Sequence, residues 1–178
     1  KLSSGLTVSG GGTANFTYNS FLSPTGGDLR FFEASGRELE YEVENWDTTG
    51  ESRIWVEGLL GATTTAFTAA WANPNLPLTA PSYTFDGSAW SNNFSAAWHM
   101  TNIVAGSFVD SSPSTNHAVG NGATIDAAGQ IGPAASFDGT TWADVGFSGS
   151  LNPNCFSASA WAHRAPGGLF KNSDAAAE

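Results

Sequence analysis

Three of the seven tryptophans in this 178-residue sequence stand where an indole ring could bind a ligand. Trp46, Trp90 and Trp142 neighbour turn residues, whereas the other four lie within alternating or apolar runs. An exposed indole offers a flat apolar face and one polar N–H, which suits it to stacking on a sugar ring. These three residues are our candidate carbohydrate-binding residues, with packing in the core as the alternative. The tryptophans that we expect in the core are Trp55, Trp71, Trp98 and Trp161.

A second group of reactive side chains is the run of alternating carboxylates Glu38, Glu40, Glu42 and Glu44. Two carboxyl groups carry out glycoside hydrolysis, and one of them needs an apolar pocket that raises its pKa. Carboxylates at every second position of a strand instead share one face, which normally meets water. We therefore predict an acidic outer face with no catalytic residue in it.

Two aspartates are candidate metal ligands. Asp138 belongs to a Phe-Asp-Gly triplet that repeats the one at Asp86, and Asp110 precedes two serines. Carboxylate and loop carbonyl oxygens are the ligands that calcium prefers, so calcium is the one cofactor that these residues suggest. The alternative is that Asp-Gly simply forms a tight turn.

The single cysteine, Cys155, cannot form an internal disulfide, and we expect it to be buried as a small hydrophobic residue. A catalytic thiol would need a histidine partner. His163 is close in sequence, but nothing in the sequence favours that pairing over chance.

Composition and charge exclude several kinds of partner. The net charge of −10 leaves too few cations for binding nucleic acid or an anionic lipid surface. No segment has the roughly 20 apolar residues that a membrane span needs. Charged residues make up only 12% of the chain, while small neutral polar residues are plentiful, which is typical of extracytoplasmic β-proteins (periplasmic, cell-surface or secreted). The start at Lys1, without an initiator Met or an apolar leader, is typical of a processed or truncated product.

The elements that must position these residues are short strands. Alternating runs are separated by Gly-, Pro- and Asp-containing turns every ten or so residues, a spacing that predicts an all-β fold of two antiparallel, jelly-roll-like β-sandwich segments. The predicted strands include residues 15–18, 29–32, 40–44, 53–56, 63–71, 96–100, 134–137, 142–145 and 156–162.

A proline-rich stretch at residues 73–81 interrupts this pattern, because proline cannot join a central ladder. We therefore predict a first domain at residues 1–75, a linker or connecting strand at 76–93, and a second domain at 94–178. The second segment is too short for a complete sandwich, and its strand edges would need another chain or a missing part of the same chain to cover them.

Residues 15–73 resemble the domain family of unknown function DUF2341. The resemblance rests on Gly27 to Phe31, Leu39 to Trp46, Ile54 to Val56 and Trp71-Ala72-Asn73. Residues 94–164 resemble the first half of a LamG-like, concanavalin A-like sandwich. Its motifs are Ala97-Trp98-His99-Met100, Asp110-Ser111-Ser112, Gly129-Gln130-Ile131-Gly132, Ser136-Phe137-Asp138-Gly139 and Ser159-Ala160-Trp161.

The resemblance implies a domain of large bacterial surface proteins, found at times beside MotA/TolQ/ExbB-type proton channel subunits, with loops that often bind calcium. We expect a non-catalytic extracytoplasmic recognition or adhesion module whose partner is a polysaccharide or a protein. The alternative is a structural subunit or accessory domain of a larger surface or membrane-associated assembly. A glycan-active hydrolase is less favoured, because the second segment lacks the closely spaced acidic strand of concanavalin-type glucanases and fold alone does not confer activity.

Overall fold

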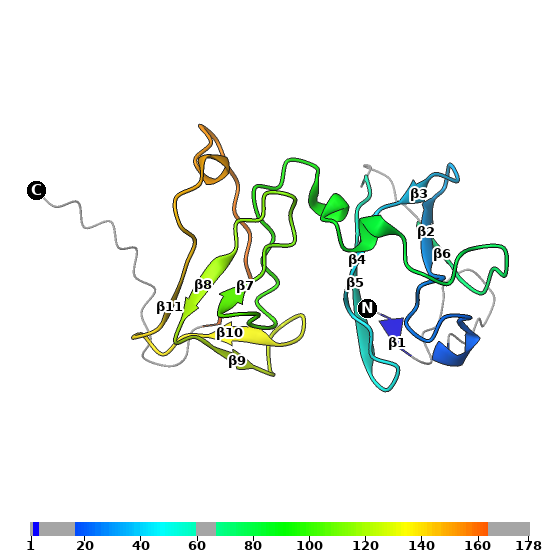
Figure 1. Cartoon of the computed structure of the whole chain (residues 1–178), viewed down its shortest axis with the longest axis horizontal. Coiled ribbons are helices and arrows are strands. Elements are labelled where there is room, and N and C mark those ends of the chain that lie inside the picture. The colour runs from blue at the N-terminus through cyan, green and yellow to red at the C-terminus, as the bar shows by residue number, and fades with distance from the viewer. Residues whose placement is uncertain (1, 4–16, 60–66, 164–178) are drawn as a thin grey trace, which may run out of the picture. The chain divides into compact units, whose positions relative to one another are not determined.

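The computed structural model describes residues 2–3, 17–59 and 67–163. Their regular structure consists of short strands in antiparallel sheets, joined by loops and single turns of 3-10 helix (Figure 1). The prediction of an all-β fold is therefore confirmed, while the sandwich arrangement stays a prediction. None of the helical turns in these ranges has the length and apolarity that crossing a membrane requires.

The chain divides into two compact units. Unit 1 comprises Lys1–Ala97 together with Ser111–Ser114, and unit 2 comprises Trp98–Asp110 and Thr115–Glu178. Residues 76–93, for which the prolines predict a linker or connecting strand, group with unit 1 in this division.

The described residues of unit 1 form two three-stranded antiparallel sheets, in the orders β1-β5-β4 and β3-β2-β6. The strands are β1 (Leu2–Ser3), β2 (Arg30–Glu33), β3 (Glu38–Leu39), β4 (Tyr41–Asn45), β5 (Glu51–Val56) and β6 (Phe67–Ala70). Three single turns of 3-10 helix accompany them, η1 (Tyr18–Ser20), η2 (Ser82–Thr84) and η3 (Ser88–Trp90). Of the strand predicted at residues 15–18, the first two residues lie outside the described ranges, and Tyr18 begins η1.

A tight turn at Asp47 joins β4 to β5. The carboxylate Oδ1 of Asp47 accepts hydrogen bonds from the backbone N–H groups of Thr49 (2.8 Å) and Gly50 (3.0 Å). These bonds close the reversal, and they fix the register in which Tyr41 pairs with Val56. The hairpin therefore has a defined inner and outer face.

The core of unit 1 lies against the inner face of this hairpin. Tyr41 and Leu29 are completely buried, Val43 and Ile54 pack against the same cluster, and the Phe31 and Tyr41 rings meet edge to face at 5.2 Å. Interlocking rings of this kind define a single packing arrangement. The buried members of the cluster are Tyr18, Phe21, Leu29, Phe31, Leu39 and Tyr41.

Unit 2 contains the three-stranded sheet β11-β8-β7 and the two-stranded sheet β10-β9, both antiparallel. The strands are β7 (Ser107–Phe108), β8 (Ala118–Asn121), β9 (Thr124–Asp126), β10 (Ala134–Ser136) and β11 (Trp142–Asp144), and a single 3-10 turn, η4 (Gly149–Leu151), follows them. Phe108, Ala118 and Ala123 are its buried core residues.

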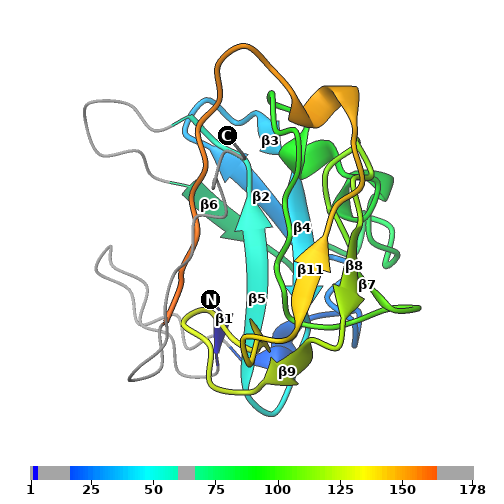
Figure 2. The same cartoon turned by 90° about the vertical axis from the view of Figure 1, so that its left-hand side faces the viewer.

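The strand predicted at residues 156–162 does not form. This segment runs as a bare ribbon without an arrow (orange in Figure 1 and Figure 2), and Phe156 and Trp161 are 80% and 75% exposed. Its alternating pattern suits a strand, but an extended segment becomes a strand only beside a partner. The burial predicted for Cys155 is wrong for the same reason, because the thiol lies exposed at the start of this segment.

Candidate aromatic binding surface

The outer face of the β4–β5 hairpin combines aromatic and acidic side chains. Because Tyr41 and Val43 face the core, Glu42 faces outward, and the strand register pairs it with Trp55 on β5. Glu44 follows at a bulge between Val43 and Asn45. Glu40, Glu42 and Glu44 belong to this face as predicted, and an indole lies within it. The prediction is wrong for Glu38, which lies on β3 in the other sheet.

A short turn brings a second indole to this face. The Oδ1 atom of Asp86 accepts hydrogen bonds from the backbone N–H (2.9 Å) and hydroxyl (2.5 Å) of Ser88, which start η3. Gly87 has a φ of 89°, and a Cβ there would lie 3.0 Å from the Pro113 nitrogen, so glycine is needed at this position. The turn holds Trp90 beside the hairpin.

Trp55, Trp90 and Phe94 form one continuous group of rings, which we call the aromatic surface. The Trp55 and Trp90 centroids lie 5.5 Å apart at an interplanar angle of 56°, and the Phe94 ring stands at 88° to Trp90 at 5.1 Å. Both indoles are half-buried and Phe94 is 49% exposed. Rings held in contact with one another and partly open to solvent can receive the apolar face of a ligand.

Carboxylates fix both indoles of the aromatic surface. The Trp90 Nε1–H donates to Glu42 Oε2 at 2.6 Å, and the Trp55 Nε1–H donates to Glu44 Oε2 at 2.7 Å. The other oxygen of Glu42 accepts a hydrogen bond from the Ser111 hydroxyl at 2.7 Å. Charge-assisted hydrogen bonds of this length orient the rings before any ligand arrives.

A carboxyl pair borders the aromatic surface. Glu40 and Glu57 are joined across the strands by the bond from the Glu57 N–H to the Glu40 carbonyl (2.9 Å). Burial raises the pKa of the Glu40 carboxyl, and the negative charges of Glu57 and Asp86 and a side-chain hydrogen bond to Glu57 add to the rise. This face therefore concentrates negative charge.

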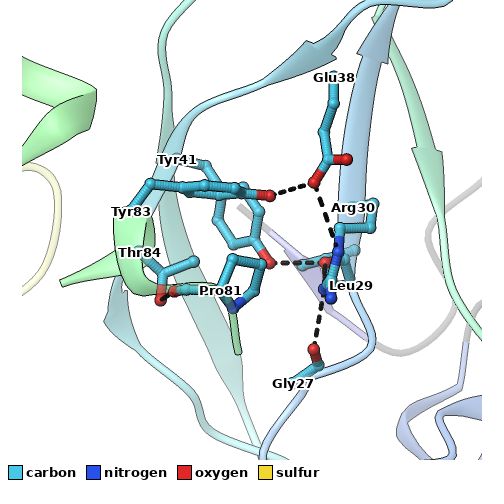
Figure 3. Close-up of polar contacts among 8 residues, drawn as sticks. All are labelled: Gly27, Leu29, Arg30, Glu38, Tyr41, Pro81, Tyr83 and Thr84. Carbon is cyan, nitrogen blue, oxygen red and sulfur yellow. Dashed lines mark hydrogen bonds and ion pairs between the residues drawn. The ribbon is translucent and has the colours of Figure 1, made fainter. Parts of the chain in front are cut away.

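The segment that supplies Trp90 is held to the β2–β3 hairpin by a polar network that runs from buried Arg30 to exposed Glu38 (Figure 3). Arg30 Nη1 donates to the carbonyls of Gly27 (2.8 Å) and Leu29 (2.5 Å), and Arg30 Nε lies 3.4 Å from Glu38 Oε1. The same carboxylate accepts a hydrogen bond from the Tyr83 hydroxyl on η2. The network therefore links the β2–β3 hairpin to residues 81–84.

The two tyrosines of this network stay neutral. The Tyr41 hydroxyl donates to the Leu29 carbonyl at 2.5 Å, and burial raises the pKa of Tyr41 to about 12. Burial is also the main cause of the raised pKa of Tyr83, and its hydrogen bond to Glu38 raises that pKa further. Both phenols act as hydrogen-bond donors, and the bond from Tyr83 to Glu38 is the one that holds the segment on the hairpin.

Asp28 of the Gly-Gly-Asp-Leu-Arg-Phe run is a structural residue. It is completely buried, and its carboxylate accepts backbone N–H bonds from Leu22 (3.0 Å), Ser23 (3.0 Å) and Ala72 (2.9 Å). Burial by itself raises the pKa of this carboxyl, but the backbone hydrogen bonds outweigh it and hold the pKa below its ordinary value. Asp28 thus ties the loop before β2 to the end of β6.

The three tryptophans predicted to bind sugar occupy different settings. Trp90 lies in the aromatic surface. Trp46 is half-buried, packs edge to face on Phe21 (5.0 Å), and donates its indole N–H to the Pro24 carbonyl at 3.0 Å. Trp142 lies on β11 of unit 2, is 57% exposed and pairs in register with Asn121.

The tryptophans predicted for the core divide evenly. Trp71 packs against the unit 1 core and Trp98 against that of unit 2, whereas Trp55 lies on the aromatic surface and Trp161 is 75% exposed. Trp55, Phe94 and the bracing role of Glu42 and Glu44 were missed from the sequence. The signal for Trp55 was present, since a hairpin joining the two predicted strands places it beside the acidic face.

Both candidate calcium ligands close loops. Asp110 is 4% exposed, accepts the Asn116 N–H at 2.7 Å through Oδ2, and donates its own N–H to His117 Nδ1 at 3.0 Å. Asp138 is exposed, and its Oδ1 accepts three hydrogen bonds from Thr140 and Thr141. The bonds from Thr140 and Thr141 lower the pKa of the Asp138 carboxyl.

No cluster of three or more His, Cys, Asp or Glu suited to a metal ion occurs within residues 2–3, 17–59 and 67–163. A calcium site at Asp110 or Asp138 would need oxygen atoms of other kinds, such as loop carbonyls. Calcium binding remains a prediction.

Comparison with protein-family models, with curated proteins and with solved structures finds no match to this chain. The resemblance to DUF2341 and to LamG-like domains stays a prediction that rests on the sequence motifs.

Proposed function

We propose that this chain is a non-catalytic recognition module that works outside the cytoplasm and binds a polysaccharide through the aromatic surface of unit 1. The observation that carries the proposal is the contact between the Trp55, Trp90 and Phe94 rings, with both indole N–H groups fixed by carboxylates. Because the rings are already ordered, binding a sugar would cost little side-chain entropy.

The chemistry of this surface favours a sugar over other ligands. A pyranose ring has one apolar C–H face that stacks on an indole, and its hydroxyl groups can reach the carboxylates and the Ser111 hydroxyl at the rim. A nucleic acid also stacks on aromatic rings, but its phosphates would be repelled by a chain of net charge −10.

Affinity electrophoresis in gels that contain neutral polysaccharides tests this proposal. We expect the wild type to be retarded, and Trp90→Ala to weaken binding by about tenfold or more, as loss of a central aromatic anchor does. Trp161→Ala is the matched control, since Trp161 is exposed and does not belong to the aromatic surface. Equal retardation of Trp90→Ala and wild type would refute the proposed site.

A second candidate function is favoured by residues 152–163. This extended segment presents Phe156 and Trp161 to solvent and joins no sheet of the described residues. Strand-like segments with open edges pair readily with other chains. A structural subunit of a bacterial surface or membrane-associated assembly, including the proton-channel-linked systems that the resemblance implies, would use it in this way.

Native mass measurement tests this second function. Assembly predicts particles larger than the 18.4 kDa chain and their loss in the double variant Phe156→Ser/Trp161→Ser. A stable monomer at all concentrations would contradict it.

A further inference from the structure

The polar edge of each indole in the aromatic surface is already engaged, so a ligand would meet these rings through their π electrons. Each indole N–H of Trp55 and Trp90 is already donated to a carboxylate, at 2.7 Å and 2.6 Å. An N–H that donates to an anion shifts electron density into its ring, and the negative face of an indole is the strongest cation-binding face among the aromatic side chains. These two rings are therefore prepared to attract a positive charge.

The carboxylates lie on the same face of the sheet as the rings. Glu42 is the register partner of Trp55, and the Glu40–Glu57 pair comes two residues further along both strands, which is the next position on that face. Asp86 starts the turn that ends at Trp90 and acts electrostatically on Glu40. A cation over the indoles would have carboxylates on either side.

The charged groups that face Glu40 are mostly acidic. Glu57 on β5 and Asp86 before η3 oppose its ionisation, and Arg37 is the one cation among its main electrostatic neighbours. Arg37 is also paired with Glu33. A positively charged ligand would relieve this repulsion, whereas a uronic acid or a sulfated sugar would increase it.

We infer that the polysaccharide bound here carries free amino groups, as a polymer of 2-amino-2-deoxy sugars does, with the ammonium group over the Trp55–Trp90 faces and the sugar ring stacked beside it. This inference rests on the proposed function, and it makes the carboxylates that border the aromatic surface the residues that select the charge of the ligand.

Calorimetric titration with three oligosaccharides of equal length tests the inference. The ligands are oligomers of glucosamine, N-acetylglucosamine and glucose, at about pH 6, where the amine is largely protonated and ordinary carboxylates are ionised. We expect the glucosamine oligomer to bind about tenfold more tightly than either neutral oligomer, and added salt to reduce that advantage.

Variants separate the contribution of the carboxylates from that of the indole rings. Glu40→Gln/Glu57→Gln should bring the glucosamine oligomer close to the affinity of the neutral oligomers. The control Asp144→Asn, which removes an exposed carboxylate of unit 2, should not. Trp90→Ala should weaken the binding of all three oligomers by about tenfold or more. Trp90→Phe keeps a ring but removes the indole, and it should retain the neutral oligomers while reducing the advantage of the amine.

The outcomes distinguish the ligand class from the proposed function. Equal binding of all three oligomers, weakened in Trp90→Ala, overturns the amino-sugar inference and leaves polysaccharide binding standing. Binding of none of them at millimolar concentration overturns both. Binding of an oligolysine peptide with the same dependence on Trp90, without binding of the glucosamine oligomer, assigns the surface to a cationic protein and overturns the inference.

Discussion

Unit 1 and unit 2 both consist of short strands, but they differ in how many large side chains they bury to stabilise them. In unit 1, large aromatic and aliphatic side chains interlock, and the buried charges of Asp28 and Arg30 have partners. In unit 2, the buried core residues among those described are Phe108 and two alanines. Small side chains remove less apolar area from water, so each contact in unit 2 contributes less.

The exposed apolar side chains show the same difference. Among the described residues, six large apolar side chains of unit 2 are more than half exposed, against three in unit 1 (Leu59, Leu78 and Phe85). The six are Val104, Val119, Trp142, Phe147, Phe156 and Trp161. Apolar side chains left in solvent contribute little burial free energy, so unit 2 gains less from its apolar residues than unit 1 does. The comparison teaches that unit 1 packs most of its large side chains into one core that supports the braced rings of the aromatic surface, whereas more of the apolar side chains of unit 2 stay outside its core.

The largest test of this comparison is Phe108→Ala. Phe108 is 1% exposed and is the one large member of the unit 2 buried cluster. Its truncation should cost about 3–5 kcal/mol and unfold unit 2 while unit 1 stays folded. Hydrogen-exchange mass spectrometry follows both units separately. Phe147→Ala, at a side chain that is 92% exposed, is the control and should change little. Simultaneous loss of protection in unit 1 would show that the two units fold as one.

A smaller effect is expected for Asp28→Asn in unit 1. The two carboxylate oxygens of Asp28 together accept three backbone N–H groups, whereas an amide has only one acceptor oxygen. The variant therefore loses part of these hydrogen bonds, at a cost of about 1–3 kcal/mol. Denaturant unfolding measures it. Asp47→Asn, at an exposed turn, is the matched control and should cost less.

The pH dependence of the Asp28 variant checks its mechanism. Because the folded pKa of Asp28 lies below its ordinary value, its contribution is complete above that value and is lost as the pH falls through the folded pKa. Wild type and Asp28→Asn should therefore converge in acid. A difference in unfolding free energy that stays constant down to the lowest pH would point to a cause other than the charge.

Glu40→Gln should have an effect of the opposite sign. The pKa of Glu40 is raised in the folded protein. The contribution of this carboxyl to stability is therefore fully present below its ordinary pKa, and it declines as the pH rises through the folded pKa. The free energy of unfolding of Glu40→Gln, measured relative to that of wild type, should therefore increase as the pH rises from acidic to neutral. Thermal melts of both proteins from acidic to neutral pH measure the trend. A variant that is less stable than wild type at neutral pH would show that the carboxylate makes favourable contacts.

The sequence predicted the parts of this structure that depend on local pattern. Strand alternation located β2, β4 and β5 and predicted which face of β4 is acidic, because a period of two assigns each side chain to one face. Trp55 was misassigned to the core, because alternation alone does not say which face of β5 is covered.

The contacts that assemble the aromatic surface are long-range, and local pattern does not encode them. Ser111 reaches Glu42 across 69 residues, and Trp90 reaches it across 48. The prolines at 74–81 rightly excluded a central strand, yet they gave no sign that Tyr83 and Trp90 dock on β3 and β4 through hydrogen bonds. Residues 156–162 have a strand pattern without a strand, since a pattern cannot supply the neighbouring edge.

Calcium removal is expected to have the smallest effect. Oδ1 of Asp138 is already occupied by hydrogen bonds from Thr140 and Thr141, and Asp47 and Asp86 in unit 1 accept the same kind of bonds from a residue two positions on. Turns that recur in both units need no metal to form. A chelator should therefore leave the melting temperature of unit 2 unchanged, and Asp138→Asn should lower its stability by only about 0.5–1.5 kcal/mol, the value of a hydrogen bond. A calcium-dependent rise in melting temperature that is lost in Asp138→Asn or Asp110→Asn would instead establish calcium as a ligand of the unit 2 loops.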